Sequence, residues 1–183
     1  MTGPLSSLKV LDFSTLLPGP YGTMMLADMG AEVVCVEAIS SGIEKRFVPM
    51  RQYLGRSKRS LAIDLKKPGS QNIIKSLIEH YDIIVEQFRP GVMDKLSLGY
   101  ESLKKLNPKI IYCSLTGYGQ TGPFKNRAGH DINYLATSGL SSYSGTKKEG
   151  PVLSGTQIAD VGGGSLHTVV GLLAAFIHRE KTG

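Results

Sequence analysis

Apolar and polar positions alternate along the chain in two ways, as short apolar runs and as segments in which apolar residues recur at helical spacing. The short runs predict five strands, at residues 8–14, 32–37, 59–65, 82–87 and 110–115. Between them, helical spacing bounded by Pro, Gly or Asn predicts helices at residues 21–29, 71–80 and 89–95, and a further one that ends before Asn107. Because a strand, a helix and a second strand fit into residues 8–37, we expect βαβ units and hence an α/β fold with a doubly wound parallel sheet.

The last third of the chain carries a different pattern. A Gly-rich loop at residues 117–123 is followed by a helical segment at 130–137, a loop rich in Gly, Ser and Lys at 138–155, and a long helix at 162–180. The apolar face of this last helix would need a partner if it were left exposed. Its longest apolar stretch, residues 166–177, is shorter than the roughly 20 residues that span a bilayer, so we expect no membrane association.

The positive charge of the chain is concentrated in one segment. The 183 residues include 21 Lys and Arg against 15 Asp and Glu, a net charge of +6. Residues 44–67 contain eight basic and two acidic residues and so carry the whole surplus. A nucleic-acid-binding protein usually spreads its charge over a face or a tail. We therefore expect no nucleic-acid partner, and a local site for an anion instead.

The cysteines and the N-terminus bear on the cellular compartment. Cys35 and Cys113 each lie in a predicted strand, without the spacing of a metal or redox motif. Free, buried thiols are typical of a reducing compartment. The first residues also lack the apolar core of a signal peptide. We therefore expect a soluble cytoplasmic protein, whose length suits one domain.

Two segments could bind phosphate. Residues 17–22 join the first strand to the first helix, as a phosphate loop would, but they lack a glycine fingerprint, which favours a tight Pro/Gly turn. Residues 55–60 combine Arg56, Lys58 and Arg59 with Gly and Ser. This mixture suits phosphate, because guanidinium groups bind it bidentately and small residues let backbone N–H groups approach. A solvated loop accounts for the same residues, and both interpretations stay open.

Two further segments could carry acid–base chemistry. His130 and Asp131 follow the Gly-rich loop and could transfer protons, although a surface histidine beside a helix-capping aspartate has the same sequence. Asp160 shortly precedes three glycines at residues 162–164. It could be a helix N-cap, but consecutive glycines destabilise a helix. They are expected where a ligand or another backbone must come close.

Taken together and in this order, six motifs resemble the family III CoA-transferase superfamily, and within it the alpha-methylacyl-CoA racemases. The motifs extend over nearly the whole chain: LKVLDFSTLLPGPYGTMMLADMGAEVVCVE, GRSKRSLAIDLKKP, EQFRPGVMDKLSLGY, NPKIIYCSLTGYGQTGP, AGHDINYLATSG and IADVGGG. The resemblance implies a Rossmann-like large domain and an acyl-CoA substrate. Coenzyme A would arrive as part of that substrate, with no metal and no separate cofactor.

The same resemblance implies a set of site residues. His130 and Asp160 would be the two acid/base residues. The CoA contacts would be Ile63, Asp64, Leu65 and Lys66, together with Gly129, Asp131, Ile132, Asn133 and Tyr134. Our further candidates for phosphate or adenine contact are Arg56, Arg59 and Arg89.

Three functions are compatible with these residues. In a racemase, His130 and Asp160 invert the α-carbon of a 2-methylacyl-CoA, one removing a proton and the other returning one to the opposite face. Asp160 then needs a raised pKa, which an apolar pocket would supply. In a CoA-transferase, the Asp160 carboxylate attacks the thioester and forms an acyl-enzyme; the family's transferases generally lack the histidine, which favours the racemase. A CoA-binding or dimerising fragment without activity is the third function.

The resemblance also implies a longer protein. Family members are about twice as long as residues 1–183, with a small second domain that this chain would lack. Two chains interlock in the family and share the active site, so a homodimer is expected. We therefore expect residues 1–183 to be an N-terminal CoA-binding large domain, truncated and barely active alone. The sequence departs from the racemases at Ala38, where they commonly have an Arg that contacts CoA.

Overall fold

The computed structural model describes residues 3–39 and 48–183, and its centre is a five-stranded parallel sheet with the strand order β3-β2-β1-β4-β5. The strands are β1 (Lys9–Asp12), β2 (Glu32–Glu37), β3 (Arg59–Ala62), β4 (Ile83–Glu86) and β5 (Ile111–Ser114). The helices are α1 (Pro18–Asp28), α2 (Val48–Leu54), α3 (Ser70–Ile78), α4 (Val92–Lys95), α5 (Tyr100–Leu103), α6 (Asp131–Thr137), the 3₁₀-helix η2 (Leu140–Tyr143), the π-helix η3 (Ile158–Leu166) and α7 (His167–Thr182). The predicted α/β fold with a doubly wound parallel sheet is confirmed.

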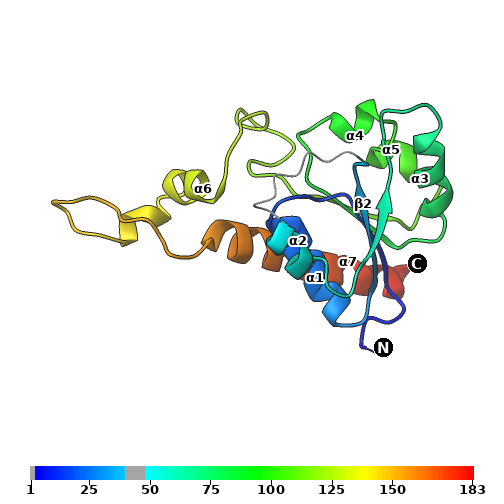
Figure 1. The fold of residues 1–183 in the computed structure, drawn as a ribbon, viewed down its shortest axis with the longest axis horizontal. Helices are drawn as coiled ribbons and strands as arrows, with labels where there is room; N and C mark the ends of the chain where they lie inside the picture. The colour runs from blue at the N-terminus through cyan, green and yellow to red at the C-terminus, as the bar shows by residue number, and fades with distance from the viewer. Residues whose placement is uncertain (1–2, 40–47) are drawn as a thin grey trace.

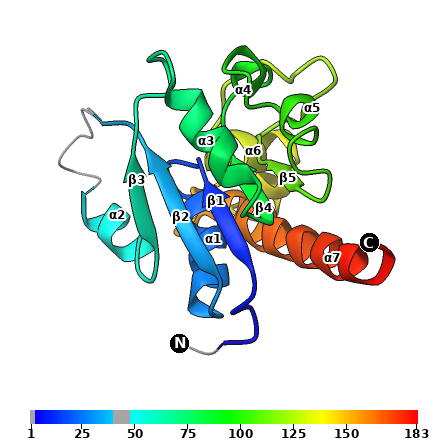
Figure 2. The ribbon, with the colours of Figure 1, turned by 90° about the vertical axis from the view of Figure 1, so that its right-hand side faces the viewer.

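Helices cover both faces of the sheet. Neighbouring residues of a strand point to opposite faces, so Val10 and Leu11 belong to two different clusters of buried side chains. One cluster packs the sheet against α3, α4 and α5, and the other packs it against α1 and α7 (Figure 2). All four residues of β4 are buried, as expected for a central parallel strand that is covered on both sides.

The predicted elements are found, with differences at their ends. β2 has the predicted bounds, whereas β3 ends at Ala62 because the chain turns at Asp64, whose carboxylate accepts the Lys66 N–H at 3.0 Å. Helix α2 has no counterpart among the predicted elements. Its seven residues belong to the basic segment at residues 44–67, which was interpreted as a site for an anion and not as a helix. Cys35 and Cys113 are free, as predicted, and burial raises the pKa of these thiols to about 12 and about 11.

The last helix begins earlier than predicted. η3 leads without a break into α7, so that residues 158–182 form 25 residues of continuous helix. By length and composition this is the one helix of the described residues that could cross a membrane, with 22% of its most apolar window buried. Core helices of soluble proteins pass the same test, and Val169 and Leu172 belong to the core, while Val170 and Ile177 are more than half exposed. The apolar stretch at residues 166–177, used above to judge whether the helix could span a bilayer, is therefore shorter than the apolar window of the observed helix.

The chain between β5 and η3 extends away from the sheet. α6 lies at the base of this arm, and residues 138–157 form its outer part (Figure 1). An isolated bridge joins Thr146 to Gly150 near the tip. The apolar side chains of Tyr143 and Leu153 are 88% and 79% exposed. α6 and the start of the outer part, at Ser138 and Leu140, line the cavity described next.

Candidate active site

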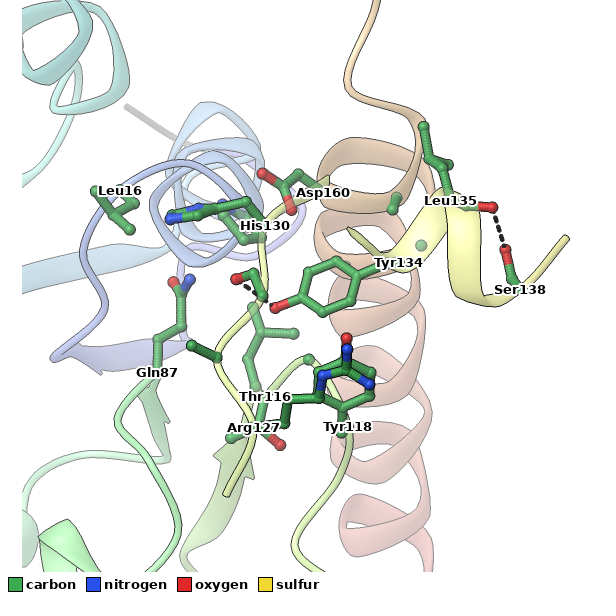
Figure 3. A pocket seen from close by; sticks show the side chains of 18 of the residues that line it. Leu16, Gln87, Thr116, Tyr118, Arg127, His130, Tyr134, Leu135, Ser138 and Asp160 are labelled. Atoms are coloured by element: carbon green, nitrogen blue, oxygen red, sulfur yellow. Dashed lines mark hydrogen bonds between the residues drawn. The ribbon is translucent and has the colours of Figure 1, made fainter. Parts of the chain in front are cut away.

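A cavity lies where the strand order reverses, beside the carboxyl ends of β1, β4 and β5. Its volume is about 680 Å³. The loops that follow these three strands contribute Leu16, Gln87 and Thr116, while α6 and η3 contribute Tyr134 and Asp160 (Figure 3). Open α/β sheets bind their ligands at this reversal point, because the helices on either side diverge there. The position of the cavity therefore follows from the topology.

His130 stands immediately before α6, and its main chain is fixed by bonds within the first turn. Its N–H donates to the side-chain oxygen of Asn133 at 2.9 Å, and its carbonyl accepts the Asn133 N–H at 2.8 Å. The Tyr134 hydroxyl donates to the Gly129 carbonyl at 2.7 Å. Reciprocal bonds of this kind stabilise a helix start. These bonds fix the backbone of His130, whose imidazole lines the cavity.

Asp160 lies in the first turn of η3 and is tied to α6. Its N–H donates to Oδ1 of the buried Asp131 at 2.8 Å. Burial and the negative charge of Asp131 raise the pKa of the Asp160 carboxyl, and the nearby His130 partly offsets this rise. Figure 3 shows the His130 and Asp160 side chains at the same end of the cavity. An imidazole and a carboxyl group whose pKa is raised therefore meet at this end of the cavity.

The raised pKa of Asp160 predicts a pH-dependent effect of Asp160→Asn on stability. The folded protein holds this proton more tightly than the unfolded chain, so ionisation of Asp160 destabilises the fold as the pH rises above the usual aspartate range. The amide carries no such charge. We expect the melting temperature of Asp160→Asn to exceed that of the natural protein by about 1–3 °C at pH 7, with a smaller difference near pH 4, measured by differential scanning calorimetry. A gain independent of pH would contradict this origin.

The glycines after Asp160 have two roles. A side chain at Gly164 would come within 2.9 Å of the Pro18 side chain, so this glycine lets η3 pack closely on α1. A side chain at Gly163 would meet no atom within 4 Å, and this residue lines the cavity. Close packing at Gly164 is thus against the Pro18 side chain, where a ligand or another backbone was predicted, while Gly163 leaves the cavity open.

Three cations, Arg89, Lys125 and Arg127, line the cavity. Within residues 3–39 and 48–183, none of the three is paired with a carboxylate. The Arg127 guanidinium lies 5.5 Å from the centre of the Phe124 ring. Tyr118 packs edge-to-face on Phe124 and on Tyr134. A wall that is positively charged and aromatic suits an anionic ligand with planar groups.

The structure places part of the predicted site at this cavity. His130, Asp160, Gly129, Tyr134 and Arg89 line it. Two neighbours on α6 support these residues from behind, since Asp131 accepts the Asp160 N–H and Asn133 accepts the His130 N–H. Ile132 does not line the cavity, and its side chain is 51% exposed.

The other predicted contacts lie outside the cavity. Arg56 forms a bidentate pair with Asp28, and Arg59 lies 3.8 Å from Glu32. Ile63 is buried in the core, the turn at Asp64 follows it, the Leu65 carbonyl accepts the Gln71 amide, and Lys66 is exposed. Residues 44–47 of the basic segment lie outside the described residues. Acidic side chains of α1 and β2 thus pair with Arg56 and Arg59, for which the sequence predicted contact with phosphate or adenine.

Several lining residues were not predicted from the sequence: Leu16, Gln87, Thr116, Tyr118, Lys125 and Arg127. Each lies in the loop that follows β1, β4 or β5 in the structure. The rule that ligands bind at the carboxyl ends of parallel strands would have found these loops, although not the individual side chains. In the described part of the chain, no group of three or more His, Cys, Asp or Glu side chains could hold a metal ion.

Comparison with known proteins gives the family. The sequence profile of CoA-transferase family III matches residues 5–183. The chain belongs to this family. Human alpha-methylacyl-CoA racemase is 44% identical over 179 residues, which cover 98% of this chain and 45% of that protein. Human succinyl-CoA:glutarate CoA-transferase is 41% identical over 189 residues, which cover 98% of this chain and 43% of that protein.

A solved structure agrees with this assignment. A CAIB/BAIF family protein from Brucella suis superposes with a TM-score of 0.92 at 33% identity, covering 100% of this chain and 51% of that chain. The chain therefore spans about half the length of the family III relatives that it matches. Since a racemase and a CoA-transferase are similar to it to nearly the same degree, family membership indicates an enzyme of the racemase and CoA-transferase superfamily. It does not separate the two reactions.

Proposed function

We propose that this chain carries the acid–base pair of an acyl-CoA racemase that inverts the α-carbon of 2-methylacyl-CoA thioesters. The observation that carries the proposal is that His130, immediately before α6, and Asp160, in η3, line one end of one cavity. Burial and the charge of Asp131 raise the pKa of the Asp160 carboxyl, which favours its protonated form relative to an exposed aspartate, as the acid role requires. The 44% identity to human alpha-methylacyl-CoA racemase supports the same reaction.

The proposed reaction needs one base and one acid. Neutral His130 removes the α-proton, the C–H electron pair forms the enolate of the thioester, and protonated Asp160 returns a proton to the opposite face of the α-carbon. For the other enantiomer the Asp160 carboxylate is the base and the His130 imidazolium is the acid. Substrate and product are isomers, so no other reactant is consumed.

The cations of the cavity suit the CoA portion of this substrate. Its phosphate groups are anionic, and Arg89, Lys125 and Arg127 face the cavity without a carboxylate partner among the described residues. We propose that these three side chains bind the phosphates, in place of the Arg56 and Arg59 expected from the sequence. The aromatic row of Tyr118, Phe124 and Tyr134 would border the same ligand.

We further propose that the working enzyme is a homodimer that contains more than residues 1–183. Relatives are about twice as long, and the arm and α7 expose apolar side chains, among them Leu153 and Val170. Such surfaces are usually covered in the assembled protein. The activity of residues 1–183 alone is then expected to be far below that of the complete gene product.

Exchange of the α-proton tests the proposal. The complete gene product is incubated with one enantiomer of a 2-methylacyl-CoA in D₂O, and the α-carbon is followed by NMR. We expect deuterium at this carbon together with formation of the other enantiomer. If neither occurs while CoA binds, the racemase proposal is wrong.

A CoA-transferase is the second candidate, because human succinyl-CoA:glutarate CoA-transferase is 41% identical. The Asp160 carboxylate would attack the thioester carbonyl, and the C–S bond would break. CoA thiolate would depart, and a mixed anhydride between Asp160 and the acyl group would remain on the enzyme. Attack by CoA on the Asp160 carbonyl would then release the acid and form an enzyme thioester. Hydroxylamine added during turnover would convert Asp160 into a hydroxamate detectable by mass spectrometry. Binding of CoA without either activity would indicate the inactive fragment.

A further inference from the structure

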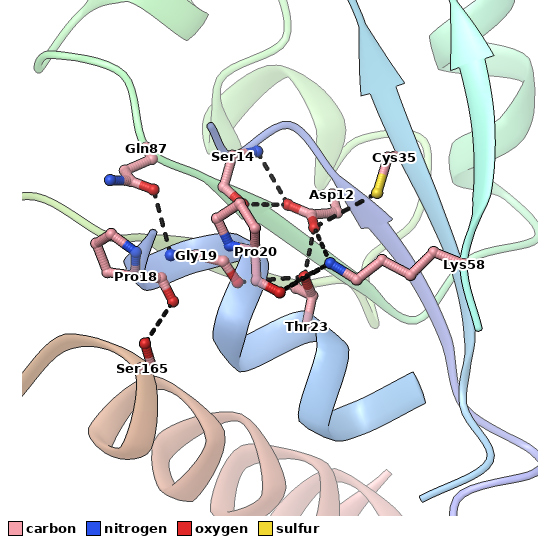
Figure 4. Close-up of polar contacts among 10 residues, drawn as sticks. All are labelled: Asp12, Ser14, Pro18, Gly19, Pro20, Thr23, Cys35, Lys58, Gln87 and Ser165. Atoms are coloured by element: carbon pink, nitrogen blue, oxygen red, sulfur yellow. Dashed lines mark hydrogen bonds and ion pairs between the residues drawn. The ribbon is translucent and has the colours of Figure 1, made fainter. Parts of the chain in front are cut away.

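A buried ion pair lies behind the cavity, between Lys58 and Asp12. Their side chains are 2% and 0% exposed, and Lys58 Nζ lies 3.3 Å from Asp12 Oδ2. The same ammonium donates to the Pro20 carbonyl at 2.8 Å and to the Thr23 hydroxyl at 2.7 Å (Figure 4). Asp12 in turn accepts the Thr23 hydroxyl, and it accepts the Ser14 N–H at 2.9 Å. Each proton of the ammonium therefore has a partner.

This pair is unlike the other ion pairs of the basic segment. Arg56 and Arg59 lie at the surface, where an ion pair contributes little to folding. Removing Lys58 and Asp12 from water is costly, and an apolar pair of similar size is often at least as stable. The Lys58 ammonium also fixes the position of the end of β1 relative to the first turn of α1, because it binds both Asp12 and the Pro20 carbonyl.

The segment between these two anchor points forms part of the cavity wall. Residues 13–17 join β1 to α1, and Leu16 and Pro18 line the cavity. Leu16 has a φ of 59°, in the left-handed region that a leucine rarely adopts, so the surrounding bonds must hold it there. The Gly19 N–H also donates to the Gln87 side chain at 3.3 Å, which fixes the segment to the loop after β4.

One hydroxyl connects this segment to Asp160. Ser165 is fully buried in η3, and its Oγ lies 2.7 Å from the Pro18 carbonyl and 3.1 Å from the Asp160 carbonyl. Close packing at Gly164 brings the same two segments together. A shift of the first turn of α1 would therefore move both a wall of the cavity and the turn that carries Asp160.

We infer that Lys58 is a positioning residue: with Asp12 it holds residues 13–20 in the conformation that shapes the cavity and seats the Asp160 turn. Lys58 does not line the cavity, and it acts through α1 and Ser165. The inference about the reaction rests on the proposed function, whereas the inference about the segment can be tested without it.

The experiment compares Lys58→Met with Lys104→Met, the same change at an exposed lysine of the α5 region. Amide hydrogen exchange of the complete gene product is followed by mass spectrometry. We expect Lys58→Met to speed exchange in residues 13–23 and 158–166 at least tenfold, with little change in β4 and β5. The double variant Asp12→Asn/Lys58→Met removes both charges, so no unpaired charge is buried and the fold stays intact. Residues 13–20 then lack the ammonium that holds them. We expect the same local increase in it.

Activity supplies the second readout. We expect Lys58→Met to lower kcat for α-proton exchange at least tenfold, while the Kd for CoA, set by cations of other loops, stays within twofold. Amide exchange that rises equally in all regions would show a purely structural role and overturn the inference. Amide exchange in the double variant that equals that of the natural protein would overturn it too. Loosened residues 13–23 with an unchanged kcat would overturn it as well. If the natural protein exchanges no α-proton, the proposed function fails, and the amide exchange still decides whether Lys58 holds the segment.

Discussion

Replacing Asp160 with Asn is expected to abolish both α-proton exchange and CoA transfer, each by about a thousandfold or more. The amide can neither donate nor accept a proton at the α-carbon, and it cannot attack a thioester. It preserves the shape of the side chain, so the hydrogen bond from the Asp160 N–H to Asp131 should survive. The measurement is the rate of deuterium incorporation and of acyl transfer in the complete gene product.

The control for Asp160→Asn is Asp28→Asn, which removes an exposed carboxylate of α1. We expect it to leave both rates unchanged, and both variants to bind CoA with similar affinity, because the cations lie elsewhere in the cavity. An Asp160→Asn enzyme that still exchanges the α-proton at a tenth of the natural rate would show that another group acts opposite His130.

The fold could be predicted from the sequence largely because β1, β2, β4 and β5 lie in short apolar runs, whereas the edge strand β3 is mostly exposed. β2 has the predicted bounds since its apolar run lies between two acidic residues, Glu32 and Glu37, and Gly30 precedes it. The start of the last helix was predicted four residues too late, at 162 instead of 158. Residues 158–161 lack a marked N-cap, and packing of Gly164 against Pro18 and the bond from Ser165 to the Pro18 carbonyl hold this turn in place.

The site could be predicted only in part. His130 and Asp160 are 30 positions apart, and the resemblance to a family, rather than spacing, brought them together. The basic segment was assigned to phosphate because its charge is visible in the sequence, but the partners of that charge are not. Asp28 and Glu32 pair with Arg56 and Arg59 at the surface. Asp12 forms a buried ion pair with Lys58. Lys66 of the same segment is exposed and stays a predicted contact. Of the cations that line the cavity, Arg89 was a candidate from the sequence, whereas Lys125 and Arg127 are single basic residues of a loop and gave no signal.

Replacing His130 with Ala separates the two reactions that family III membership leaves open. In the racemase, we expect α-proton exchange to fall by about a thousandfold, since one of the two proton-transfer groups is lost. Formation of a thioester at Asp160 needs only the carboxylate, so a transferase would still form it. The measurements are deuterium incorporation at the α-carbon and trapping of Asp160 by hydroxylamine. His178→Ala, at an exposed position of α7, is the matched control and should change neither.

The rescue of His130→Ala by added imidazole sharpens this test. The cavity of about 680 Å³ is large enough to admit imidazole in the space that the side chain vacates. A proton carrier that is free to diffuse can replace a base but not a residue that only shapes the cavity. We therefore expect imidazole to restore part of the exchange in His130→Ala, and none in Asp160→Asn. Unchanged exchange in His130→Ala without imidazole would exclude His130 as the base and show that another group removes the α-proton.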